Sequence, residues 1–165
     1  MATTDYLLKI EGVQGESKQE GYADHIDLDS WSWGMSNSGS AAQGGGLGTA
    51  KASAQDFHFV IRNGKSSPQL FYFCSTGKVI PTATLICRKS TGDTSTGEYY
   101  RVIFNECLIS SHQQGGSGGS NMLPMEQVSF NYAKVTVEYH EQKEDGSLGG
   151  IASTHSYDVK LGKAA

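Results

Sequence analysis

The chain has 165 residues, of which 37% are hydrophobic and 18% charged, and its formal net charge is −4 at pH 7. These values exclude a disordered polyelectrolyte, and the scattered 13 Lys and Arg leave no basic patch for nucleic acid. Residues 1–165 are predicted to form a single domain whose core needs no disulfide or metal scaffold. We expect no cofactor and no nucleic-acid partner.

The N-terminal segment MATTDYLLKIEGV has no basic region, no long apolar run and no cleavage site of small residues. A secretory signal peptide needs all three features. No apolar stretch approaches the roughly 20 residues of a membrane-spanning helix. We therefore expect synthesis in the cytoplasm, no direct insertion into a membrane, and any export by a route that needs no signal peptide.

Alternation of apolar and polar residues, the pattern of half-buried strands, runs along most of the chain. The alternation changes phase within residues 128–139, which predicts a bend or a bulge at Ala133–Lys134. Bulky residues occupy both faces of residues 98–109, as in a strand that is covered on both sides. The predicted strands lie near residues 6–10, 26–33, 57–61, 83–87, 98–109, 128–139 and 157–161.

A second phase change lies between two apolar pairs of one predicted strand. Ile26 and Leu28 occupy even positions, whereas Trp31 and Trp33 occupy odd positions. One extra residue near Asp29–Ser30 would turn all four side chains toward the core, so we predict a β-bulge there. Trp31 and Trp33 are then core anchors.

One short helix is predicted at about residues 68–76, within SSPQLFYFCSTGK. Ser67 can cap it, Pro68 suits its first position because no N–H is needed there, and Gly77 can end it in the left-handed conformation. Seven or eight strands and one helix imply a mainly β protein, either a closed barrel or a two-sheet sandwich. The apolar residues expected to pack on the sheets are Leu70, Phe71, Phe73 and Cys74.

The residue types that could support chemistry show no catalytic or metal-binding spacing. Cys74, Cys87 and Cys107 lie far apart and are interpreted as small buried hydrophobic residues. Asp27 and Asp29 would share a strand face, but the predicted bulge separates them, which favours a solvated face over a carboxylate pair. The Gly-rich segment does not match a Walker or dinucleotide motif, and no nucleophile elbow is present, so no enzyme is expected. The five histidines are predicted at the surface: His25, His58, His112, His140 and His155.

Five segments stand in a fixed order and spacing: DSWSWGMSNSGS (29–40), GGGLG (44–48), SSPQLFYFCSTGK (66–78), ISSHQQGGSGG (109–119) and VSFNYAKVTVEYHEQKEDG (128–146). Together they closely resemble the haemolysin-coregulated protein (Hcp) family, the tube protein of the type VI secretion system. The resemblance runs from the first predicted strand to about residue 150.

This resemblance implies a β-barrel of two antiparallel sheets with one flanking helix. It also implies hexameric rings that stack into a tube, inside a contractile sheath and behind a VgrG-type spike, and that are expelled to the extracellular space or into a target cell. Relatives resemble phage tail tube proteins, and some carry effector proteins in the ring lumen. The alternatives are a dedicated effector-binding chaperone ring and, in another class, a β-barrel enzyme or lectin-like binder.

Within this family the extended Gly-rich loop at about 39–51 is predicted to be an arm on a neighbouring subunit, because small side chains let a backbone lie close to another surface. A mobile surface loop is the alternative. Ser32 points away from the two tryptophans and is expected to face the lumen, with solvent or the next subunit as alternatives. The two-faced segment 98–109 would contact a neighbour or lie under the helix. Leu47 is the expected anchor among the arm residues Gly44, Gly45, Gly46, Leu47, Gly48 and Lys51.

Overall fold

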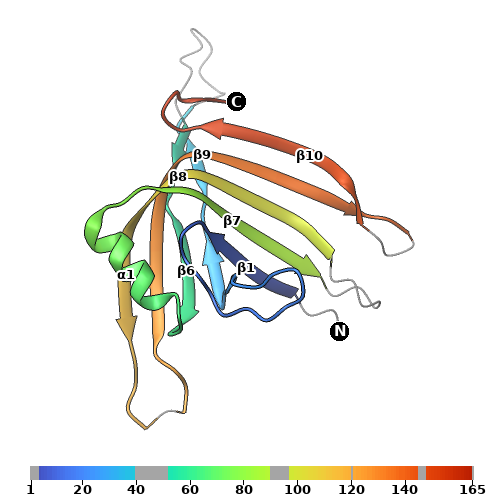
Figure 1. The fold of residues 1–165 in the computed structure, drawn as a ribbon. Coiled ribbons are helices and arrows are strands. Elements are labelled where there is room, and N and C mark those ends of the chain that lie inside the picture. The colour runs from blue at the N-terminus through green and yellow to red at the C-terminus, as the bar shows by residue number, and fades with distance from the viewer. Residues whose placement is uncertain (1–3, 40–51, 90–96, 120, 145–147, 165) are drawn as a thin grey trace.

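The computed structural model describes residues 4–39, 52–89, 97–119, 121–144 and 148–164. These residues form a mainly β structure with one helix, α1 (Ser67–Thr76) (Figure 1). None of the helical structure in these ranges is both long and apolar enough to cross a membrane. The strands are β1 (Thr4–Ile10), β2 (Ile26–Asp27), β3 (Ser30–Ser32), β4 (Met35–Asn37), β5 (Ala52–Ala54), β6 (Phe57–Arg62), β7 (Ile80–Lys89), β8 (Gly97–Gly115), β9 (Met125–Gln142), β10 (Leu148–Asp158) and β11 (Lys163–Ala164).

Nine of the described strands share one hydrogen-bonded sheet, and β4 and β5 form a second sheet of their own. The main order is β11-β10-β9-β8-β7-β1-β2, while β6 pairs with both β9 and β3. All of these pairs are antiparallel. The closed barrel that the resemblance implies is not confirmed: the ladder of described strands stays open between β2 and β3, which belong to different neighbours.

The chain changes partner strand just before the two tryptophans. Leu28 N donates to Tyr6 O (3.0 Å) on β1, whereas Asp29 N donates to Val60 O (2.9 Å) on β6. Leu28 is buried in the core, and Trp31 packs against the same core from the next strand. The predicted bulge is therefore wrong: the phase changes because β2 pairs with β1 and β3 pairs with β6.

The two longest strands bend together at the second predicted phase change. Tyr132 and Val135 are both buried, so the inward-facing positions switch from even to odd across Ala133–Lys134. The β8–β9 register continues through this point without an inserted residue, and Glu106 on β8 has a left-handed backbone (φ 51°). Figure 1 shows both strands rising from the lower end and turning across the molecule. The predicted bend is confirmed, and the bulge alternative is not.

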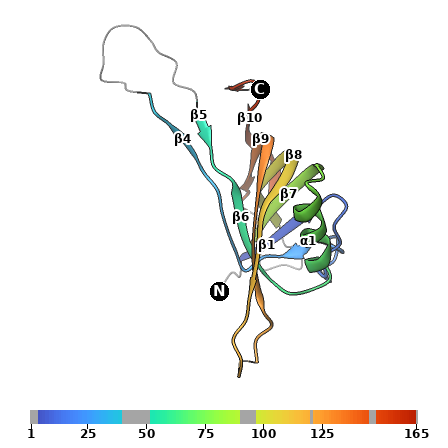
Figure 2. The ribbon, with the colours of Figure 1, turned by 90° about the vertical axis from the view of Figure 1, so that its left-hand side faces the viewer.

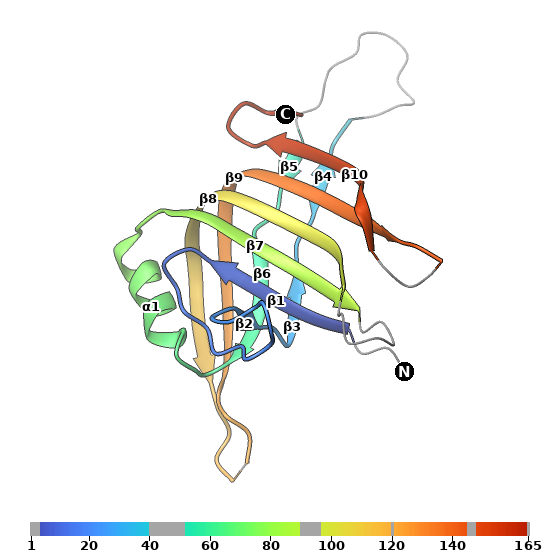
Figure 3. The ribbon, with the colours of Figure 1, turned by 45° about the vertical axis from the view of Figure 1, so that its right-hand side comes forward.

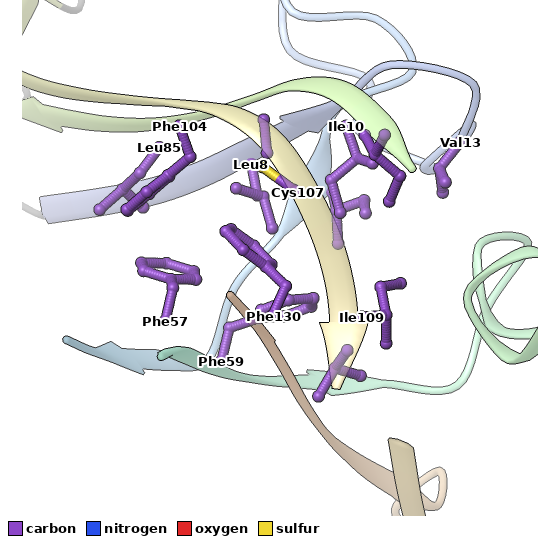
Figure 4. Packing of buried hydrophobic residues seen from close by; sticks show 14 of the residues in the cluster. Leu8, Ile10, Val13, Phe57, Phe59, Leu85, Phe104, Cys107, Ile109 and Phe130 are labelled. Carbon is purple, nitrogen blue, oxygen red and sulfur yellow. The ribbon is translucent and has the colours of Figure 1, made fainter. Parts of the chain in front are cut away.

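Aromatic rings from β6, β8 and β9 fill the centre of the core (Figure 4). The Phe57 ring centroid lies 5.0 Å from that of Phe104 and 5.0 Å from that of Phe130. Phe104 and Phe130 meet edge to face at 5.2 Å. Such contacts stabilise beyond the burial of area alone, by about 0.5–1.5 kcal/mol a pair. Phe104 and Phe130 lie on opposite sides of the bend in β8 and β9, so their contact joins the two halves of the bent strands.

Helix α1 presents a narrower apolar face than the sequence indicates. Leu70 and Phe73 are buried and Cys74 is half-buried, but Phe71 is 61% exposed because it lies about 100° around the helix from Leu70. Phe71 was expected on the packed face, and that prediction is wrong. Pro68 lies in the first turn and Gly77 ends the helix at φ 66°, as predicted, whereas the N-cap position belongs to Ser66.

Candidate assembly surfaces

The β4–β5 hairpin stands off the body of the molecule (Figure 2). Among the described strands, its ladder joins only its own two, with Met35 opposite Ala54 and Asn37 opposite Ala52. A two-stranded sheet is marginally stable in water without a third strand or a packing surface. This hairpin is the root of the predicted arm. The arm residues themselves, Gly44, Gly45, Gly46, Leu47, Gly48 and Lys51, lie outside the described residues.

The two tryptophans pack at the base of this hairpin. Trp31 stacks on Phe57 with ring centroids 6.3 Å apart, and Trp33 meets the edge of Phe104 at 5.8 Å. Both indoles are half-buried against the core cluster. Ser32, between them on β3, is exposed and is paired with His58 on β6. The alternation of β3 thus places a small hydroxyl on the face opposite the tryptophans.

Where β7, β8, β9 and β10 lie side by side in the main sheet, the face turned away from the core carries several hydroxyl groups. Cross-strand pairing sets Thr84, Ile103, Thr136 and Ser156 side by side on β7, β8, β9 and β10. The hydroxyls of Thr136 and Ser156 lie 2.8 Å apart. All four residues are half-exposed. The sequence predicted bulky residues on both faces of 98–109, and Ile103 is left half-exposed on the outer one.

A buried arginine on β7 joins the segment between β1 and β2 to β7 and β8. Arg88 is 3% exposed, stacks on the ring of Tyr22 at 4.3 Å and donates to the side-chain oxygen of Gln19. The Tyr22 hydroxyl donates to Glu98 Oε1 (2.5 Å), and the other oxygen of that carboxylate, Oε2, pairs with Arg101. Burial, together with Glu98, raises the pKa of Tyr22 to about 12. Tyr22 therefore remains a hydrogen-bond donor in this contact at any ordinary pH.

A buried polar cluster joins α1 to β8 and β9, and the sequence interpretation missed it. Glu126 accepts hydrogen bonds from Ser67 Oγ (2.5 Å), His112 Nε2 (2.9 Å) and Gln114 Nε2 (2.7 Å). The His112 side chain is only 6% exposed, so its predicted surface position is wrong. These residue types resemble a hydrolytic triad, but both Ser67 and His112 bond to the carboxylate, which does not bring a base to the serine.

The cysteines and Asp27 are the remaining candidates for chemistry. Burial raises the pKa of the Cys87 and Cys107 thiols to about 12, so both behave as the predicted hydrophobic residues. Cys74 on α1 is only half-buried, unlike the prediction. Asp27 is exposed, and its pKa is raised by burial of part of the side chain and by Asp5. Across the described ranges no group of three or more His, Cys, Asp or Glu could hold a metal ion.

Comparison with known proteins gives one consistent family. Residues 7–139 match the family model described as "Type VI secretion system effector, Hcp". Protein hcp1 of Pseudomonas aeruginosa is 42% identical over 156 residues, which cover 94% of this chain and 95% of that protein. A solved type six secretion system protein has a TM-score of 0.87 and 27% identity, covering 99% of this chain and 100% of its own. Hcp1 from Salmonella typhimurium gives 0.77 and 29%, with all of both chains covered. The chain therefore belongs to the Hcp family of type VI secretion system proteins.

Proposed function

We propose that this chain is a tube subunit of a type VI secretion system, with residues 1–165 acting as one tube domain. Copies would form hexameric rings, and the rings would stack into the inner tube that the system expels. The role requires a contractile sheath around the tube, a VgrG-type spike ahead of it and effector proteins in its lumen. It also implies delivery to the extracellular space or a target cell without a signal peptide.

The β4–β5 hairpin is the observation that carries this proposal. It stands apart from the main sheet, and an isolated hairpin gains stability by lying on another surface. A neighbouring copy of the chain supplies such a surface in a ring. Exposed apolar side chains on β9 and β10 also support a contact with a neighbouring copy: Tyr139 on β9 and Ile151 on β10.

Rings are expected in the purified protein. Negative-stain images should show particles with a central hole, and native mass spectrometry should give six times the mass of the 17.7 kDa chain. The physical reason is that a ring would bury the exposed apolar side chains and give the two-stranded β4–β5 sheet a surface to pack on. A monodisperse monomer at the concentrations used for imaging would contradict the proposed function.

A lumen position for Ser32 follows from the same proposal. Ser32 is exposed and lies on the face of β3 opposite two tryptophans that pack against the core. A small polar side chain suits a wall along which different cargo proteins are held or passed. We expect a Ser32→Cys variant of the ring to react with a small thiol reagent and not with one wider than the pore. Equal labelling by both reagents would place Ser32 outside the lumen.

A ring that mainly holds effectors, with little part in a tube, is the second candidate function. The exposed serines of β3 favour it as a surface for cargo. Effector proteins that copurify with soluble rings, in the absence of tubes, would support this role over the first.

A further inference from the structure

The paired ends of β8 and β9 extend below the body of the molecule, and α1 lies beside the strands just above this extension (Figure 3). We call the described residues 111–119 and 121–126 the β8–β9 projection. Within it, Gln114 faces Glu126 and Gly115 faces Met125. Near its tip, the Met122 and Leu123 side chains are each 58% exposed. A projection with apolar residues near its tip is suited to contact another protein, provided that its direction is fixed.

Main-chain pairing supports this projection on one side only. On the β9 side, β6 pairs as far as Arg62 opposite Met125. On the β8 side, β7 pairs only as far as Ile80 opposite Cys107, so the described part of β8 beyond that point has no further strand on this edge. Helix α1 packs along β8. The direction of the projection therefore depends on how α1 is joined to β8 and β9.

Glu126 makes that junction. Its side chain is 0% exposed, and its two carboxylate oxygens accept from three side chains on two elements: Ser67 at the start of α1, and His112 and Gln114 on β8. Ser67 Oγ in turn accepts from Gly64 N (3.0 Å), which adds the turn before the helix. Phe71 covers the outer side, its ring centroid 6.2 Å from that of His112. The carboxylate thus holds the helix start and both strands in one geometry.

A carboxylate at this position is a poor choice for stability alone. Removing a charged group from water is costly, and a well-packed apolar side chain of similar size often stabilises a fold as much or more. A fully bonded polar network instead favours one arrangement, because any shift leaves a buried donor or acceptor without a partner. His112 and Gln114 donate from one strand face and Ser67 donates from the helix, so a rotation of α1 against β8 breaks at least one of these bonds.

We propose that the buried Glu126 carboxylate is a positioning residue that fixes the direction of the β8–β9 projection relative to α1. It thereby presents the projection to a second copy of this chain during assembly, and this last clause rests on the proposed function. Glu126, Ser67 and the His112 side chain are buried, whereas Gln114 is exposed, and the network needs no ligand in this role. Its contribution is geometric, so its loss should change the orientation of the projection before it changes the fold of the core.

The direct test measures the distance between α1 and the projection. Spin labels are attached at Ser75→Cys and Ser117→Cys, both exposed, in a chain carrying Cys74→Ser. The buried Cys87 and Cys107 stay unlabelled, since burial raises the pKa of both thiols to about 12. Pulsed electron paramagnetic resonance is recorded with excess unlabelled protein, so that only distances within one chain contribute. One narrow distance is expected when the Glu126 network is intact.

Glu126→Gln and Ser67→Ala are each expected to broaden this distance distribution. The glutamine can place an amide N–H₂ group at the position of Oε1, to which His112 and Gln114 both donate. The alanine removes the hydrogen bond from Ser67, one of the three that Glu126 accepts. Ser66→Ala is the matched control, because Ser66 is an adjacent buried serine whose side chain makes no cap hydrogen bond. Ile10→Val, a core change on β1, controls for general destabilisation, and both controls should keep the narrow distance. Narrow distances in both test variants would overturn the proposal. If Glu126→Gln does not fold, Ser67→Ala decides the question alone.

Native mass spectrometry of the same variants tests the assembly clause separately. Fewer rings in Ser67→Ala than in Ser66→Ala are expected. Unchanged rings together with a broadened distance would overturn the assembly clause and retain the positioning role. A complete absence of rings, in the unmodified chain as well, would contradict the proposed function, and the distance measurement would still decide the role of Glu126.

Discussion

Phe130→Ala is expected to lower the free energy of unfolding by about 3–5 kcal/mol, the range for truncating a buried phenylalanine. Phe130 is fully buried on β9, and its ring touches those of Phe57, Phe59 and Phe104 from β6 and β8. The neighbouring rings are fixed by two strands and cannot easily move into the space, so a cavity should remain. Urea unfolding followed by tryptophan fluorescence measures the loss.

The matched control makes the same truncation on the surface. Phe71→Ala also removes a benzyl group, but from a helix position that is 61% exposed. Its cost should stay within about 1 kcal/mol, because the ring is mostly in water already and its truncation removes the ring contact with His112. A comparable loss of stability at the two positions would contradict the division between core and surface described for α1 and β9.

The comparison of Phe71 with Phe130 shows what periodicity can predict. Strand alternation assigned Phe57 and Phe130 inward-facing positions, because in a strand every second side chain turns to the same face. A short helix gives a weaker signal, since Leu70 and Phe71 are adjacent but point about 100° apart. An apolar residue next to a buried one in a helix of 10 residues is therefore not enough to predict burial.

The partner of each strand could not be read from alternation. The phase change between Leu28 and Trp31 was visible in the sequence, yet the same change follows from a bulge or from a switch between β1 and β6. Periodicity describes the two faces of one strand and contains nothing about which backbone groups pair across its edges. For the same reason, closure of a barrel could be expected from the resemblance but not from the pattern.

The sequence pattern can predict the inward position of Glu126 but not that of His112. Glu126 has the same parity as Val128 and Phe130, so alternation alone places this carboxylate on the core side of β9. His112 has the opposite parity to the buried Ile109, and it turns inward because the register shifts between Ile109 and Ser111. Such an irregularity depends on pairing with the neighbouring strand, so a strand considered alone places His112 on the wrong face.

Leu47→Asp is expected to weaken assembly more than any other substitution in the arm. Leu47 is the only large apolar residue of the segment 39–51, and we propose that it anchors this arm on another subunit. Loss of an anchor residue costs about 2 kcal/mol or more at one interface, roughly thirtyfold in dissociation constant, and a buried aspartate adds the cost of an unpaired charge. Native mass spectrometry over a dilution series should show rings that dissociate at higher protein concentration.

Leu47→Met is the control, because it keeps an apolar side chain of similar volume and should retain ring stability. Rings of unchanged stability in Leu47→Asp would contradict the anchor and leave a surface loop as the better interpretation. The same pair of variants also separates the two positions that the arm could occupy. If the arm contacts its neighbour within the ring, Leu47→Asp must weaken the ring itself. If the arm reaches the adjacent ring, Leu47→Asp must leave single rings intact and abolish tubes, because only the contact between rings is lost. Electron microscopy of the assembled protein distinguishes these outcomes.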